Sequence, residues 1–161
     1  MADARVDGAL AVIAVPLNRR LVWEALQAAG ASVDFVDGQY LPEGNKSLAG
    51  VGDRVLALIV ADNARDDGLR IGRLTSSEKR AGVSDHNAGQ TSQRIQTIGN
   101  NGTLASLCDS AGLTPFINRN PSDLYTAPST KAATVEAFVG AAYKHDGIIC
   151  AAQVMRNLNI I

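Results

Sequence analysis

Apolar residues recur along most of this chain at intervals of three and four, the spacing of one face of an α-helix. The longest such stripe begins in the stretch 45–53 and predicts a helix that continues to about Ala64, where two aspartates and Gly68 end it. Gly50 and Gly52 lie inside this stripe, and each interior glycine costs a helix roughly 1 kcal/mol relative to alanine. Two interpretations follow: another backbone approaches the helix closely there, or the helix begins only near Gly52. The apolar positions of the stripe are Leu48, Val51, Val55, Leu58 and Ile59.

The same spacing predicts further helices on both sides of this segment. Thr75 and Glu78 have the spacing of a capping box for a short helix, and Asn100 or Asn101 caps a helix that Gly112 ends. No run of strict alternation is long enough for a sheet, so the predicted fold class is all-α, with one domain over residues 1–161. The predicted helices cover residues 4–15, 17–29, 90–98, 101–111, 129–143 and 147–158.

Composition narrows the class of protein. Apolar residues make up 46% of the chain and charged residues 19%, which is typical of a globular domain. A net charge of −1 and a pI near 6.1 argue mildly against a dedicated nucleic-acid binder. Cys108 and Cys150 lack paired spacing, and the apolar run 9–17 is too short to cross a membrane and follows no basic leader. We therefore expect an intracellular, cytoplasmic protein with free thiols and no membrane partner.

Two acidic residues stand out because they lie in otherwise apolar helices. Asp53 follows Gly52 in the long helix, and Glu136 lies in a stretch with hardly any other charge. Two carboxylates that met between helices would repel each other unless a cation lay between them or one kept its proton. Such a pair is typical of a metal site or an acid–base site. The alternative is that each side chain points outward into water. His86 and His145 have no ligand-spaced partner and are interpreted as surface residues.

Three stretches occur in a fixed order: NKSLAGVGD at 45–53, NGTLASL at 101–107 and ATVEAFVGA at 133–141. They resemble the signature NERLEFLGD, the N-x-x-L-A helix start and the D-x-x-E-A-L-I-G-A motif of the ribonuclease III catalytic domain. The resemblance extends over about residues 20–155. It implies the ribonuclease III endonuclease-domain fold, and we expect no double-stranded-RNA-binding domain within residues 1–161.

That family cuts double-stranded RNA with magnesium ions held by four carboxylates per subunit, in a homodimer built around the signature helix. The resemblance assigns Asp53 and Glu136 as retained metal ligands for magnesium or manganese. Lys46, Ala49 and Ala133 stand where the family has acidic residues. Two carboxylates suffice for magnesium only if water and phosphate supply the remaining ligands. We therefore expect metal-dependent hydrolysis to be weak or lost.

Lys46 and the small residues of the signature helix lead to two further expectations. A lysine in place of a glutamate brings a positive charge to the centre, and we expect it to pair with Asp53 or Glu136 and to take the place of the cation. Ala49, Gly50 and Gly52 form a small-residue face that suits close packing against the same helix of a second copy, which predicts a homodimer.

Three functions remain open at this point, so the chain is not assigned as an enzyme from sequence alone. The first hypothesis is a divergent endoribonuclease that uses Asp53 and Glu136. The second is an RNA-binding or scaffold protein that has lost the chemistry. The third hypothesis is a repurposed, metal-free enzyme on a small molecule, because fold does not fix function. Its catalytic cluster would be Lys46, Asp53 and Glu136, and the residues lining its pocket would be Asn45, Gln90 and Gln93.

Overall fold

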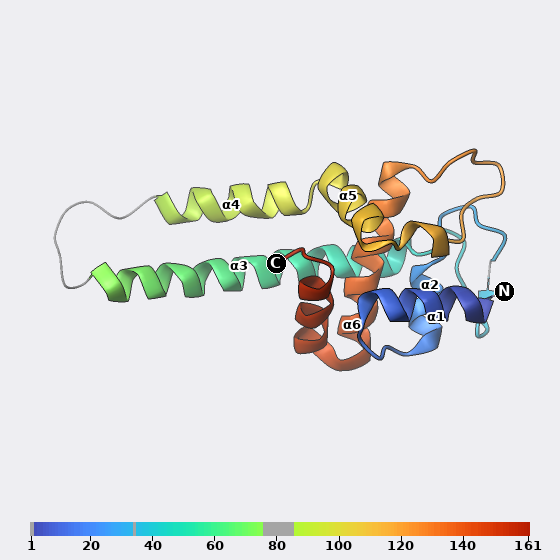
Figure 1. Ribbon diagram of the computed structural model, residues 1–161, viewed down its shortest axis with the longest axis horizontal. Helices are drawn as coiled ribbons and strands as arrows, with labels where there is room; N and C mark the ends of the chain where they lie inside the picture. The colour runs from blue at the N-terminus through green and yellow to red at the C-terminus, as the bar shows by residue number, and fades with distance from the viewer. Residues whose placement is uncertain (1, 34, 76–85) are drawn as a thin grey trace.

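The computed structural model describes residues 2–33, 35–75 and 86–161, with only the backbone described in 67–75 and 86–91. Helices dominate this part of the chain, as the spacing predicts. Figure 1 shows a body of packed helices from which α3 and α4 extend side by side. The helices are α1 (Ala2–Ile13), α2 (Arg19–Ala25), α3 (Lys46–Thr75), α4 (His86–Ile98), α5 (Asn101–Ala111), the 3₁₀ turn η1 (Thr114–Phe116) and α6 (Pro128–Asn157). None of the described helices is long and apolar enough to cross a membrane.

The core of the body forms around α6, which packs against α3, α5 and α2. The inward positions predicted for its first half, Val135, Phe138, Val139 and Ala142, are all fully buried. The helix breaks at Asp146 and Gly147, where the backbone leaves helical geometry and Gly147 takes a φ of 73° that favours glycine. The two helices predicted over 129–143 and 147–158 are therefore the two halves of α6.

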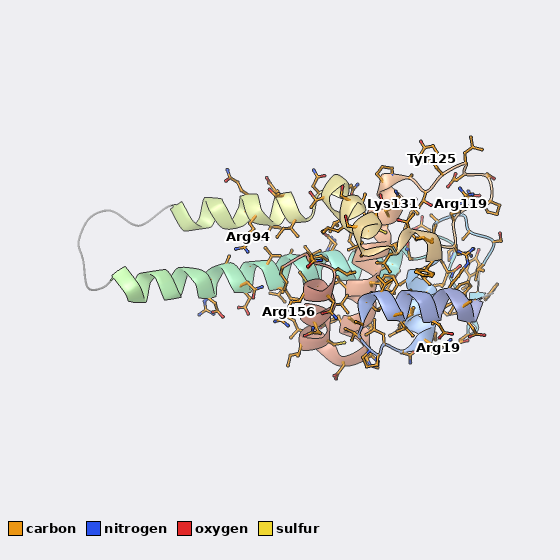
Figure 2. All side chains as sticks on the ribbon, viewed as in Figure 1. Arg19, Arg94, Arg119, Tyr125, Lys131 and Arg156 are labelled. Atoms are coloured by element: carbon orange, nitrogen blue, oxygen red, sulfur yellow. The ribbon has the colours of Figure 1, made fainter. Side chains whose placement is uncertain are left out.

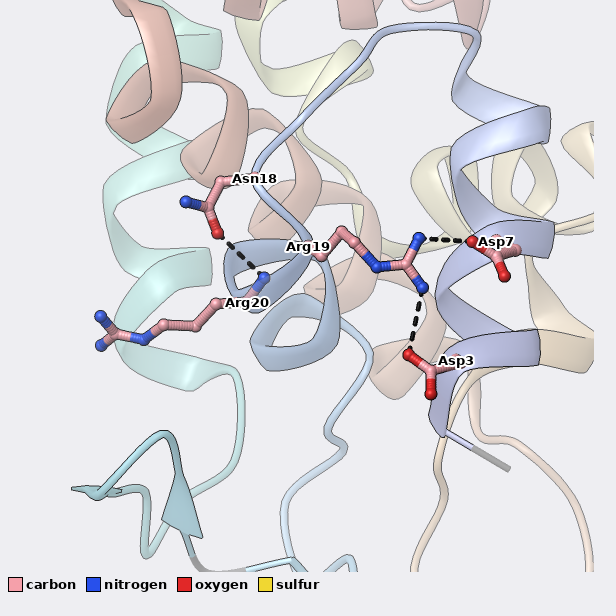
Figure 3. Close-up of polar contacts among 5 residues, drawn as sticks. All are labelled: Asp3, Asp7, Asn18, Arg19 and Arg20. Carbon is pink, nitrogen blue, oxygen red and sulfur yellow. Dashed lines mark hydrogen bonds and ion pairs between the residues drawn. The ribbon is translucent and has the colours of Figure 1, made fainter.

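Helix ends follow the predicted capping chemistry where asparagine and glycine supply it. The side chain of Asn100 accepts a hydrogen bond from the backbone N–H of Gly102 at 2.7 Å, and Gly112 ends α5 with a φ of 78°. Asn18 caps the start of α2 in the same way. The helix ends at Ala25, and it is therefore shorter than the predicted 17–29. Arg19, the first residue of α2, then ties α2 to α1 through ion pairs with Asp3 and Asp7 (Figure 3).

Four further local predictions differ from the structure. A two-stranded antiparallel hairpin, β1 (Phe35–Val36) with β2 (Gln39–Tyr40), is present where no sheet was expected. Asp37 and Gly38 turn it with positive φ at both positions, a turn signal that does not depend on long alternation. The long helix α3 continues past Gly68 to Thr75, since one glycine costs a helix only about 1 kcal/mol.

The remaining two differences concern α4 and the apolar stripe of α3. α4 begins at His86, four residues before the predicted start at Gln90, and the capping-box partner Glu78 lies outside the described residues. Leu58 belongs to the apolar stripe of α3 by spacing, yet its side chain is 56% exposed. The buried side of α3 continues instead through Leu56, Ile59 and Val60, and Leu58 faces outward.

Candidate functional site

The candidate site lies where α3 crosses α6, and two glycines set the distance between the helices. A Cβ added to Gly52 would lie 1.8 Å from the carbonyl oxygen of Glu136, and one added to Gly140 would lie 2.3 Å from the carbonyl oxygen of Leu48. Neither position can hold a side chain without moving backbone. The close-approach interpretation of the interior glycines is therefore correct, and α3 is helical from Lys46 onward.

The partner in this close approach differs from the expected one. Gly52 packs against α6 of its own chain, and Ala49 is 5% exposed within the core. Of the three small residues assigned to a dimer face, Gly50 alone is exposed, with open space around its Cα. Gly52 and Ala49 are thus explained by packing within the chain and offer no surface to a second copy, whereas Gly50 stays exposed.

The crossing brings together the two acidic residues that the sequence singled out. Asp53 follows Gly52 on α3, and Glu136 is the residue of α6 whose carbonyl faces Gly52. Burial and, to a smaller extent, the negative charge of Asp53 together raise the pKa of the Glu136 carboxyl to about 7. The sequence-based alternative in which both side chains point into water therefore fails for Glu136, which is half-buried.

A cation does stand beside this acid pair, but it is not Lys46. The Nη1 atom of Arg54 lies 2.6 Å from Oδ2 of Asp53. Lys46 pairs instead with Glu43, three residues earlier in the chain, with its Nζ 3.5 Å from Oε1 of Glu43. More than half of the Lys46 side chain is exposed. The expected pairing of Lys46 with Asp53 or Glu136 is therefore wrong in this structure. Sequence reasoning missed Arg54, although its position next to Asp53 in the chain was the available signal.

Asn45, assigned to a substrate pocket by the third hypothesis, is 2% exposed and bonded to the surrounding backbone. Its side-chain amide donates a hydrogen bond to the carbonyl oxygen of Ala25 at 2.8 Å, and its backbone N–H donates one to the carbonyl oxygen of Gln27 at 2.7 Å. Its own carbonyl accepts the first hydrogen bond of α3 from Ala49. These bonds give Asn45 a structural role: it joins the start of α3 to the end of α2.

The two glutamines of the same hypothesis belong to α4. Gln93 is exposed and lines an open groove of about 450 Å³ together with Gln96, Thr97, Asn100 and Thr103. Asp53 and Glu136 do not line this groove. The side chain of Gln90 lies outside the described residues. The structure thus brings Asp53 and Glu136 together and places Lys46, Asn45 and Gln93 in other surroundings.

The donor set at the crossing can be compared with what a metal requires. Magnesium prefers several hard oxygen ligands in octahedral geometry. In the described ranges, no group of three or more histidine, cysteine, aspartate or glutamate side chains is placed to hold an ion. The Arg54 guanidinium also occupies one oxygen of Asp53. The residues at the crossing therefore do not fit a family-type magnesium centre. A carboxyl with a pKa near 7 instead exchanges a proton readily at neutral pH.

Comparison with solved structures identifies the fold. The chain is similar to two crystal structures of the nuclease domain of ribonuclease III from Campylobacter jejuni. One has a TM-score of 0.68 at 18% sequence identity and covers 95% of this chain and 92% of that domain. The other, described for structural flexibility in a region involved in dimer formation, has a TM-score of 0.69 at 19% identity and covers 94% of each chain. No family model and no curated protein sequence matches the chain. The chain thus has the ribonuclease III nuclease-domain fold, as the motifs predicted.

Proposed function

We propose that this protein is a divergent ribonuclease III-like protein that binds double-stranded RNA, with metal-dependent hydrolysis weak or lost. The observation that carries the proposal is the acid pair at the α3–α6 crossing. Asp53 and Glu136 are held together there, while the positions of the other family acids hold Lys46, Ala49 and Ala133. Lys46 is directed toward Glu43, and Ala49 is buried in the core.

The proton on Glu136 further weakens any metal site. A carboxyl with a pKa near 7 is about half protonated at neutral pH, so an arriving cation must displace a proton as well as water. Asp53 has its own cation in Arg54. Any magnesium- or manganese-dependent cutting by this pair should therefore be slow and should increase as the pH rises above 7.

The test is cleavage and binding of a labelled, blunt RNA duplex by the whole chain. Binding is measured at low salt, and cleavage with magnesium or manganese at pH 6.5 and 8.5. The variants are Asp53→Asn and Glu136→Gln, and Asp66→Asn is the matched control because Asp66 is an exposed carboxylate further along α3, away from the pair. We expect duplex binding in all four proteins and little or no cleavage.

Each other outcome assigns a different function. Rapid metal-dependent cutting that both site variants abolish would show a working nuclease and refute the weakened centre. Absence of duplex binding at low salt would refute the RNA assignment. It would direct the search to small molecules, for which the near-neutral pKa of Glu136 favours a metal-free acid–base enzyme. Within the expected result, binding with no cleavage under any condition would identify an RNA-binding or scaffold protein that has lost the chemistry.

We also propose that the protein forms a homodimer, through a different surface from the one expected. Ile148 is 42% exposed and Ile149 is 81% exposed, and both border a groove of about 200 Å³ between α3 and the second half of α6. Exposed branched side chains around a groove are typical of a protein interface. A ribonuclease III nuclease domain of the same fold has a region involved in dimer formation, which supports a second copy as the occupant.

Light scattering tests the dimer. We expect a mass near twice the 16.8 kDa of one chain for the unmodified protein and a mass near one chain for Ile149→Asp. Leu124→Asp is the matched control, because Leu124 is 93% exposed on the loop before α6. The same single-chain mass for all three proteins would exclude the dimer.

A further inference from the structure

A cavity of about 460 Å³ lies away from the acid pair, bordered by α1, η1 and the loop that leads into α6. Its described lining includes two arginines, Arg5 and Arg119, and the hydroxyl residues Thr114 and Thr126, with no carboxylate among them. In a protein with a net charge of −1, a concave surface with two guanidinium groups and no acid is a local positive site.

The two arginines are held differently. Nη1 of Arg5 donates to the carbonyl oxygens of Ile117 at 2.7 Å and Phe116 at 3.2 Å, which fixes this guanidinium against the cavity wall. Within the described residues, Arg119 is exposed and has no ion pair or side-chain hydrogen bond. One donor group is thus already ordered, and the other is available to close on a ligand. Guanidinium groups arranged in this way favour a phosphate, whose oxygens accept several hydrogen bonds at once.

The loop beside the cavity also carries an exposed aromatic side chain. Tyr125 is 72% exposed and directly precedes Thr126, which lines the cavity. Figure 2 shows Tyr125 and Arg119 at the same end of the molecule. A tyrosine this exposed contributes little to the core, but its ring offers a surface on which an unpaired base can stack. Asp123, on the same loop, does not line the cavity.

We propose that this cavity and Tyr125 bind one nucleotide of an unpaired RNA segment. Arg5 and Arg119 hold the phosphate, and Tyr125 stacks on the base. The choice of RNA rests on the proposed function. The loop continues into α6 at Pro128, and Glu136 lies about 12 Å further along the helix axis at roughly 1.5 Å per residue. A single RNA that carries both a duplex and an unpaired segment can therefore reach both places.

The test measures binding of a single-stranded RNA as a function of salt concentration, with the blunt duplex and inorganic phosphate as separate probes. The variants are Arg119→Gln and Tyr125→Ala. Arg65→Gln is the control, because Arg65 is an exposed arginine on α3, outside this cavity. Each phosphate contact contributes about one unit to the slope of log affinity against log salt. Arg119→Gln should therefore reduce the slope by about one unit. Tyr125→Ala should reduce affinity about tenfold with the slope unchanged, and Arg65→Gln should match the unmodified protein.

The outcomes separate this proposal from the proposed function. Single-stranded RNA binding that Arg119→Gln and Tyr125→Ala leave unchanged overturns the site, whatever the duplex does. A phosphate-induced shift of the Arg119 and Thr126 amide signals without RNA binding assigns the cavity to free phosphate and also overturns the proposal. Single-strand binding with the expected variant effects, but no duplex binding, supports the site and refutes duplex binding as the function.

Discussion

The half-buried carboxyl of Glu136 makes the stability of the fold depend on pH in a direction that can be measured. Its pKa is about 7 in the folded protein against an ordinary value of 4.5. Because the folded state binds this proton more tightly than the unfolded state, the free energy of unfolding falls as the pH rises from 4.5 toward 7 and levels off above it. Stability from this group is thus fully present at low pH and lost near neutrality.

The magnitude follows from the size of the shift. A difference of about 2.5 pKa units corresponds to roughly 3.4 kcal/mol at 1.36 kcal/mol per unit. Glu136 is only half-buried, and solvent screening reduces this to about 2 kcal/mol. For a domain of this size, that is a decrease in Tm of roughly 4–8 °C between pH 5 and pH 8.

The assay is chemical denaturation at half-unit intervals of pH from 5 to 8, on the unmodified chain and on Glu136→Gln. Glutamine stays neutral, so the difference between the two curves isolates this group from every other titrating residue. We expect that difference to change by about 2 kcal/mol across the range. Asp53→Asn should shift the midpoint to lower pH, because it removes the second cause of the raised pKa. Parallel curves for the unmodified chain and Glu136→Gln would refute the burial argument.

Three further predictions concern the packing and the centre. Gly52→Ala should cost about 3 kcal/mol of stability or more because its Cβ meets backbone, whereas Gly50→Ala, in open space, should stabilise the fold by up to about 1 kcal/mol. Thermal unfolding compares the two variants. Equal effects would contradict the close approach of α3 and α6 at Gly52. Asn45→Ala should cost roughly 1–3 kcal/mol in the same assay by leaving a buried carbonyl without its donor, and a neutral effect would refute its structural role. The double variant Lys46→Glu with Ala133→Asp should increase magnesium- or manganese-dependent duplex cleavage by at least about tenfold, and no increase would show that the centre lacks more than carboxylates.

Much of the fold was predictable because periodicity and capping are local properties of the chain. Asn100, Gly112 and the helical spacing through Phe138 each determine structure within a few residues. The close approach at Gly52 was also predictable, since an interior glycine in an apolar helix requires a reason. Its partner was not, because a glycine can pack against its own chain or a second copy with the same sequence signal.

Side-chain direction at the site was the least predictable feature. Lys46 stands where the family has a glutamate, which led to the expected pairing with Asp53 or Glu136, but its side chain pairs with Glu43 instead. Arg54 reaches Asp53 from the neighbouring position, a contact that helical periodicity does not indicate. The Arg5–Arg119 cavity was also missed, because it joins residues more than a hundred positions apart.

The contact of backbone with backbone at Gly52 and Gly140 has a consequence for how this fold tolerates change. The position of the acid pair is set by the main chains of two helices. The side chains of Asp53 and Glu136 can therefore be substituted without disturbing the helix crossing that holds them. The residues that would carry chemistry should therefore tolerate substitution better than the residues that hold the two helices together. Asp53 and Glu136 can be replaced with little loss of folding, whereas the two glycines, which have no side chain to offer a substrate, should accept almost nothing. In such a frame, chemistry can be gained or lost in single substitutions while the architecture stays unchanged.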